Sequence, residues 1–133
     1  MEIQLVPHQP PGSTPRIIKL HNRLSDRIGI RLANKIEFIR LDQIICCEAW
    51  SNYCRIHTMD LKEPIILSKT LKYVAEVLPE STFYRTHQSF IIRIDVIRSV
   101  GDNIELSNGM RVPLSRRHKA DFMIWLEKNI TLI

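Results

Sequence analysis

The stretch that decides the fold reads FYRTHQSFIIRIDVI and runs from Phe83 to Ile97. Its middle contains three consecutive apolar residues, Phe90 to Ile92, which predict a short buried strand. The residues before this strand have no such run and predict a loop that leads into it. We expect the apolar residues of the stretch to anchor the loop in the core. His87 and Gln88 are then left at an exposed turn.

Alternating apolar and polar residues before this stretch predict a series of half-buried strands. The expected strands cover residues 28–32, 36–40, 44–49, 53–58 and 64–67. A helix is expected next, because four apolar residues recur at the spacing of one helical face: Leu71, Val74, Ala75 and Leu78. Ser68 or Thr70 can cap the start of this helix, and Pro79 ends it.

The C-terminal part predicts further strands at residues 96–100, 103–106 and 111–114. Asn108-Gly109 is a strong hairpin signal, because both residues tolerate φ > 0. Ser115 can cap a helix that runs to about Lys128, with three residues facing inward: Phe122, Trp125 and Leu126. The pattern predicts an α+β, mostly β fold of about eight or nine short strands. Short antiparallel sheets are built from successive hairpins, with a mid-chain helix and a C-terminal helix.

The N-terminal residues differ in composition from the rest. Residues 1–15 contain four prolines, which predicts a flexible lead-in, and residues 16–27 favour no single element. We therefore divide the chain into a Pro-rich lead-in, residues 1–27, and a folded domain, residues 28–133. The start lacks the pattern of a signal peptide, and no apolar run approaches the roughly 20 residues of a membrane helix. We expect a cytoplasmic protein with no membrane contact.

The chain is basic, with 19 Lys and Arg against 14 Asp and Glu and a sequence pI near 9.4. From Tyr84 to Lys119 there are seven basic residues and three acidic ones. This balance favours a polyanionic partner such as nucleic acid, with an anionic membrane surface as the alternative. Common enzyme motifs are missing, among them the P-loop, GxGxxG, HExxH and GxSxG. We expect no catalytic residues, no enzyme activity and no cofactor.

The three cysteines, Cys46, Cys47 and Cys54, cluster in one segment. Their odd number and spacing do not fit a disulfide framework, so we expect free thiols. Neighbouring strand residues point to opposite faces, so Cys46 and Cys47 do not share one metal ion easily. We expect buried cysteines and no metal site, and a redox role for Cys54 stays open.

Three motifs in this order resemble the LytTR DNA-binding domain of bacterial transcription regulators. The stretch from Phe83 is similar to the family signature Phe-x-Arg-x-His-Arg-Ser, followed by an aromatic residue, two aliphatic residues and Asn. Residues 44–56, with Glu48 and Asn52-Tyr53, are similar to its strand–turn–strand segment. Residues 106–117, LSNGMRVPLSRR, resemble its closing hairpin and Pro-x-Ser-Arg-Arg motif. The similarity covers residues 28–126.

The resemblance implies an elongated fold whose loops, rather than a recognition helix, reach into the DNA major groove. Family members are usually output domains of response regulators in two-component signalling and bind paired direct repeats, which suggests a homodimer on DNA. The residues that the resemblance places on DNA come from three loops: Asn52, Tyr53, His87, Gln88, Arg116 and Arg117. About 27 residues before the motifs are too few for a receiver domain, so we expect a standalone version or another input.

The chemistry of these residues agrees with base recognition. Arg116 or Arg117 can bond guanine O6 and N7 together, and Gln88 can bond adenine N6 and N7 in the same bidentate way. Asn52 and His87 suit contacts with bases or phosphates. Four further cations are candidate phosphate contacts: Lys69, Arg85, Arg98 and Lys119.

Each of these residues also has a purely structural interpretation. His87 can orient its loop, Tyr53 can pack in the hairpin, and Arg116-Arg117 can form a solvated helix start. Two cations at a helix N-terminus oppose the helix dipole, which favours a functional reason for them.

Two positions depart from the family pattern. Gln88 stands where Arg is commonest, and Arg93 stands where Asn is commonest, although both side chains are compatible with DNA. The alternative function is therefore a protein-interaction module of a signalling system that has lost DNA specificity. A general RNA binder is a weaker third option, because aromatic residues make up 7% of the chain and most are expected in the core.

Overall fold

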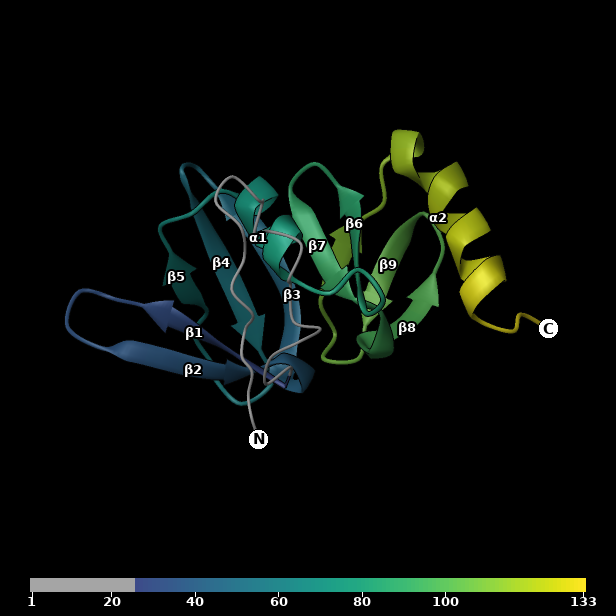
Figure 1. Cartoon of the computed structure of the whole chain (residues 1–133). Coiled ribbons are helices and arrows are strands. Elements are labelled where there is room, and N and C mark those ends of the chain that lie inside the picture. Colours follow the sequence, from purple (N-terminus) through teal and green to yellow (C-terminus); the bar gives the residue numbers. More distant parts are fainter. Residues whose placement is uncertain (1–25) are drawn as a thin grey trace, which may run out of the picture.

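The computed structural model describes residues 26–133. The expected lead-in, residues 1–27, lies outside this part except for its last two residues. The described chain forms ten strands and two α-helices in three antiparallel sheets (Figure 1). This confirms the predicted α+β, mostly β fold.

The central sheet has five strands in the order β5-β4-β3-β7-β6. Its members are β3 (Ile44–Trp50), β4 (Tyr53–Thr58), β5 (Ile65–Leu67), β6 (Phe83–His87) and β7 (Phe90–Arg93). The hairpin β1 (Arg27–Arg31) and β2 (Ile36–Arg40) forms a two-stranded sheet. The three-stranded sheet consists of β8 (Ile97–Val100), β9 (Asn103–Leu106) and β10 (Arg111–Pro113). Two 3-10 turns, Leu41–Gln43 and Ile94–Val96, lead into β3 and β8.

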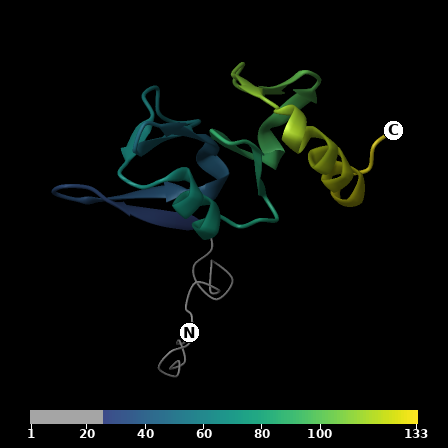
Figure 2. The ribbon, with the colours of Figure 1, turned by 90° about the horizontal axis from the view of Figure 1, so that it is seen from above.

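Strand β3 separates two hydrophobic cores. Ile44 and Cys47 belong to the core beneath the β1–β2 hairpin and α1 (Leu71–Val77). Ile45 and Cys46 belong to the core that the three-stranded sheet and α2 (Arg116–Asn129) cover. Figure 2 shows α1 and the hairpin on one side of the molecule and α2 on the other. The first four residues of β3 are therefore all buried, as expected for a strand covered on both faces.

The helices form where capping and apolar spacing predict them. Thr70 caps α1, because its Oγ1 accepts a hydrogen bond from the Tyr73 backbone N–H at 3.2 Å. The apolar face of α2 docks on β6, where the Tyr84 ring lies 4.9 Å from the Phe122 ring and 5.4 Å from the Trp125 ring. No helix within residues 26–133 is long and apolar enough to cross a membrane.

The expected loop before Phe90 is wrong, because residues 83–87 form strand β6. This strand pairs with β7, with Phe83 opposite Arg93 and Tyr84 opposite Ile92. A register shift between Arg85 and His87 interrupts the pairing. That bulge breaks the two-residue alternation of burial, which is why the segment does not read as a strand in the sequence. The other expected strands and both helices are found within one residue at each end.

The closing hairpin also differs in detail from its expected turn. Gly109 alone in the pair adopts a positive φ, of 93°. Asn108 instead accepts a hydrogen bond from the Met110 backbone N–H on its Oδ1, at 3.1 Å. The pair therefore closes the hairpin through a side-chain turn rather than through two left-handed residues.

Candidate nucleic-acid interface

Three connections meet at one end of the central sheet, along the top edge in Figure 1. They are the β3–β4 turn, the β6–β7 turn and the start of α2. Because β3 runs antiparallel to both β4 and β7, its last residues lie beside the first residues of β7. The Ala49 N–H donates to the Ser89 carbonyl at 2.8 Å, and the Ser115 N–H donates to the Thr86 carbonyl at 3.3 Å. We call residues 50–53, 87–89 and 115–117 the loop edge.

The first connection presents Asn52 between two exposed aromatic side chains. Ser51 has a φ of 55°, which non-glycine residues seldom adopt, and Asn52 is exposed beside it. Trp50 and Tyr53 pair across the turn and are 49% and 45% exposed. Tyr53 is thus no core residue, although it belongs to the hairpin. The Arg55 guanidinium lies 3.3 Å from the centroid of the Trp50 ring.

The second connection presents His87 and Gln88 in a tight turn between β6 and β7. The Ser89 backbone N–H donates to Nδ1 of His87 at 3.0 Å, so the neutral ring carries its proton on Nε2. Arg85 donates from Nη2 to the Gln88 carbonyl at 2.7 Å, which fixes the backbone of the turn. The Gln88 side chain is exposed and has no hydrogen-bond partner within the described part of the chain. His87 therefore stabilises the turn through Nδ1 and still has Nε2 available for a ligand.

The third connection presents two arginines at the first turn of α2. Arg116 and Arg117 are exposed and form no ion pair with any residue from 26 to 133. Ser115 occupies the cap position as expected, but its hydroxyl makes no capping hydrogen bond to the backbone. Its Oγ lies 2.6 Å from Nδ1 of His118 instead, because that ring folds back over the helix start. The first N–H groups of α2 are left without this side-chain partner.

His118 shows that the second and third connections share one positive field. Burial lowers the pKa of His118 most, the nearby Arg117, Arg85 and His87 lower it further, and Asp121 raises it. The two arginines come from α2 and from β6, which are far apart in the sequence. They bring positive charge together beside the loop edge.

The candidate phosphate contacts separate into two groups. Lys69 follows β5, whose Leu67 pairs with Cys54 just after the β3–β4 turn, so it lies at the same end of the sheet. Lys119 is exposed on α2, one turn after the helix start. Arg98 lies in β8, which begins at the opposite end of the central sheet. The structure brings the first two beside the loop edge but does not bring Arg98 there.

Arg93 has a structural role, which corrects its interpretation as a DNA-compatible side chain. It is 8% exposed. Its Nε donates to the Ile44 carbonyl at 2.8 Å and its Nη2 to the Asp42 carbonyl at 2.9 Å, while Nη1 pairs with Asp95 at 2.9 Å. Arg93 thereby joins both 3-10 turns at the end of the sheet opposite the loop edge.

Sequence reasoning missed Trp50, Arg55 and His118. Trp50 directly precedes the turn that contains Asn52, so an aromatic residue next to an expected DNA-binding loop was an available signal. Arg55 also lies 3.9 Å from Glu48, which in turn lies 3.0 Å from Nε2 of His57. Nothing in the spacing of His118 indicates that it lies near Arg85.

The cysteines take no part in the loop edge. All three are free and buried, as expected, and Cys46 and Cys47 point into different cores. Burial raises the pKa of Cys46 to about 12 and also raises the pKa of Cys54. Buried thiols with raised pKa values stay protonated and are poor nucleophiles. No group of metal-binding side chains occurs in residues 26–133.

Known proteins with the same arrangement place the chain in a family. The Sensory transduction protein LytT of Bacillus subtilis (strain 168) is 22% identical over 98 residues, which cover 69% of this chain and 40% of that protein. The solved LytTr DNA-binding domain of a Bacillus cereus protein has the same fold, with a TM-score of 0.65 and 20% identity. That match covers 76% of this chain and 96% of the other. A family model described as the LytTr DNA-binding domain matches residues 34–127, and the chain therefore belongs to this family of DNA-binding domains in transcription regulation.

Proposed function

We propose that the loop edge binds double-stranded DNA in a sequence-specific manner, with its loops in the major groove. The protein would act as a bacterial transcription regulator in the cytoplasm. One observation carries the proposal: three connections, distant in sequence, gather exposed donors and unpaired cations at one end of the sheet. Donors that reach base edges together with cations that neutralise phosphates are what specific recognition needs.

The dimensions of the loop edge suit the groove. The β3–β4 and β6–β7 turns are separated by two strand spacings, since β3 and β7 are neighbours. At about 4.8 Å per spacing, the two turns lie roughly 10 Å apart. This distance fits within a major groove about 12 Å wide. It also corresponds to about three base-pair steps of 3.4 Å each.

Each side chain has a role that follows from its free atoms. Arg116 or Arg117 would donate to guanine O6 and N7, and Gln88 would bond adenine. His87 has Nδ1 occupied by Ser89, so its Nε2–H would face the DNA. Asn52 would contact a base or phosphate beside the exposed ring of Tyr53.

The phosphate contacts would flank these side chains. We propose Lys69 on one side of the loop edge and Lys119 on the other, because both are exposed and lie at that end. Arg85 would reach a phosphate while it holds the Gln88 carbonyl. Arg98 would contribute only if DNA bends around the three-stranded sheet.

The biological setting of the proposal comes from the relatives. The chain spans 40% of the length of the sensory transduction protein that it matches. We propose that residues 28–133 form the output domain of a two-component system and that residues 1–27 form a lead-in to it. Two copies would bind paired direct repeats as a homodimer on DNA.

The protein-interaction alternative has lost one of its two supports. Arg93, one of the two departures from the family pattern, bonds the carbonyls of Ile44 and Asp42, so we assign it to the fold and not to a changed partner. Gln88 is the remaining departure, and it changes the preferred base rather than the partner.

The test is selection from a randomised double-stranded DNA library with the full chain, followed by anisotropy titrations on the enriched site. We expect one motif, and affinity that falls steeply with salt because several phosphates are neutralised. Lys128→Ala, an exposed cation in the last turn of α2, is the matched control for Arg116→Ala in the first turn. Failure to enrich any motif at low salt, or equal effects of the two variants, would contradict the proposal.

A further inference from the structure

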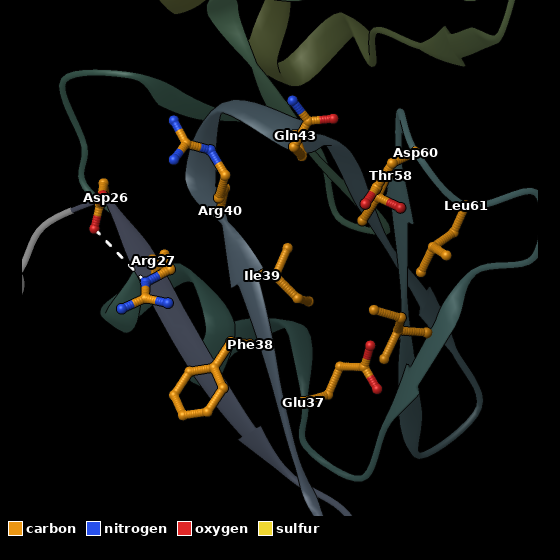
Figure 3. Close-up of a pocket in the computed structure, with 11 residues that line it drawn as sticks. Asp26, Arg27, Glu37, Phe38, Ile39, Arg40, Gln43, Thr58, Asp60 and Leu61 are labelled. Carbon is orange, nitrogen blue, oxygen red and sulfur yellow. Dashed lines mark ion pairs between the residues drawn. The ribbon is translucent and has the colours of Figure 1, made fainter.

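Two cavities flank the β1–β2 hairpin, and their charges differ. The cavity beside β2 has a volume of about 400 Å³ and is shown in Figure 3. Its lining carries both signs of charge: Asp26, Glu37, Asp60, Arg27 and Arg40. The arginines have partners already, since Arg27 lies 4.0 Å from Asp26 and Arg40 lies 2.8 Å from Asp42. Such a lining favours no particular ligand charge.

The second cavity lies between β1, the central sheet and α1, with a volume of about 280 Å³. Its walls are apolar. Ile30 of β1 faces Ile44 and Cys47 of β3. Val74 of α1 and Leu78, directly after α1, close the cavity from the side. The volume lies near the lower limit of small-molecule pockets, which begin at about 300 Å³. A ligand of this size would have a short aliphatic or aromatic body.

The charged residues that line this second cavity are both basic, Arg31 and Lys69, and no Asp or Glu of the described chain lines it. Arg31 is exposed and follows the buried Ile30 in β1, so its side chain leaves the other face of the strand and only Lys69 brings its charge to the cavity. Lys69 forms no ion pair within residues 26–133. The Lys69 ammonium lies 4.8 Å from the centroid of the Tyr73 ring, so it is held beside the cavity by a cation–π contact rather than by a carboxylate.

We propose that this cavity binds a small amphipathic carboxylate, with its apolar tail among Ile30, Val74 and Leu78 and its carboxylate at Lys69. The tail gains from leaving water, and the carboxylate gains a charge-assisted contact with Lys69, which has no acidic partner in the described structure. A neutral ligand would leave this cation unused, and a cationic ligand would be repelled.

Binding at this cavity would also reach the DNA contacts, a consequence that rests on the proposed function. Lys69 is a proposed phosphate contact and follows the strand that pairs beside the β3–β4 turn. A carboxylate bound to Lys69 neutralises that contact, so ligand and DNA should weaken each other by the same factor. Ligand binding itself does not depend on DNA and is measured without it.

The test uses the full chain and isothermal titration calorimetry with octanoate. We expect saturable 1:1 binding with a Kd on the order of 0.1–1 mM, as is usual for a ligand of so few heavy atoms. Three controls should each bind more weakly than octanoate. Octanol lacks the charge, octylammonium carries the opposite charge, and acetate lacks the apolar tail. Octylammonium binding as tight as octanoate, or no saturable octanoate binding up to about 10 mM, would overturn the proposal.

Variants separate the tail from the carboxylate. Lys69→Gln, at an exposed side chain, should weaken octanoate roughly two- to fivefold and leave octanol unchanged. Val77→Trp places an indole in the cavity and should abolish both, whereas Ile124→Trp, on the exposed face of α2, should change neither. Normal octanoate affinity in both Lys69→Gln and Val77→Trp would place binding elsewhere and overturn the proposal. Loss of DNA specificity with octanoate binding intact would count against the proposed function alone.

Discussion

Arginines lie at both ends of the central sheet, but they are used differently. At one end, Arg40 and Arg93 each pair with an aspartate two residues later in a 3-10 turn, Asp42 at 2.8 Å and Asp95 at 2.9 Å. At the other end, the loop edge holds Arg116 and Arg117 without an acidic partner in the described chain. Both paired arginines occur in the sequence pattern Arg-aliphatic-Asp.

The two ends differ in their acidic neighbours. An arginine that is paired with a nearby aspartate is not available to a ligand, whereas an unpaired one is. Arg40 lowers the pKa of the Asp42 carboxyl, first through a hydrogen bond, so each charge is satisfied locally. Arg93 is counted among the seven basic residues between Tyr84 and Lys119, yet burial removes it from the charge available to DNA. The following substitutions test this contrast between the two ends.

The largest effect is expected for Arg93→Ala, which should lower the free energy of unfolding by about 2–4 kcal/mol. It leaves the buried Ile44 carbonyl and the part-buried Asp42 carbonyl without their donor, and unpaired buried polar groups are costly. Urea denaturation measures the loss. Arg98→Ala, an exposed arginine in the neighbouring sheet, is the control and should stay within about 0.5 kcal/mol. Equal stability of the two variants would show that the buried, paired Arg93 contributes no more to the fold than an exposed arginine does.

Arg116→Ala should have the reverse profile. We expect stability within about 0.5 kcal/mol of the parent chain, because the side chain is exposed and unpaired. Affinity for the selected DNA should fall by about 1–3 kcal/mol, with relaxed preference at one base pair. Competition titrations against every base at each position reveal the relaxed pair. A uniform loss across all sequences would instead make Arg116 a phosphate contact.

A smaller effect is expected from pH, through His118. Its pKa is lowered by burial and by the nearby Arg117, Arg85 and His87, so the free protein holds this ring neutral below its ordinary titration range. DNA phosphates near the ring favour the charged form, so binding takes up a proton. Affinity should therefore rise as the pH falls below about 6.5, by less than tenfold per pH unit.

Stability should respond to pH in the opposite direction. The folded pKa of His118 lies below the unfolded one, so the unfolded chain binds more protons as the pH falls through about 6.5, and stability decreases there. His118→Gln should reduce both trends. A pH dependence of DNA affinity that is unchanged in His118→Gln would show that this ring does not sense the bound DNA.

The smallest effect is expected for Lys119→Ala. This exposed cation lies one turn after the α2 start, and we expect it to contact a phosphate and no base edge. The slope of log affinity against log salt should become shallower by about 1, with base preferences unchanged. Anisotropy titrations between about 50 and 200 mM salt measure the slope. Across this range of salt, one phosphate contact changes the affinity roughly fourfold. An altered base preference would move Lys119 into the recognition group.

Most of the fold is predictable from local sequence, because strand spacing and turn residues are local signals. The exception is β6, where Phe83 and Thr86 are buried three residues apart across a bulge. A helix cap shows a second limit. Ser115 occupies the expected position, but its hydroxyl bonds His118, since that ring competes with the backbone for the same oxygen.

The candidate site is predictable as three separate loops but not as one surface. The bond between Ala49 and Ser89 follows from the pairing of β3 with β7, and the bond between Ser115 and Thr86 follows from the docking of α2 on β6. Neither the strand order nor this docking can be derived from local sequence signals. Residue type also fails to distinguish Arg93 from Arg116, because burial and partners come from the tertiary structure.

Strand β3 carries a further consequence for how the molecule unfolds. Cys46 contributes to one core and Cys47 to the other, so both cores depend on the same few residues of backbone. Neither half can melt without exposing one face of this strand, and melting should occur as a single transition in calorimetry. The loops at its end then share one cooperative unit, and a partly folded protein with an intact loop edge is not a stable state.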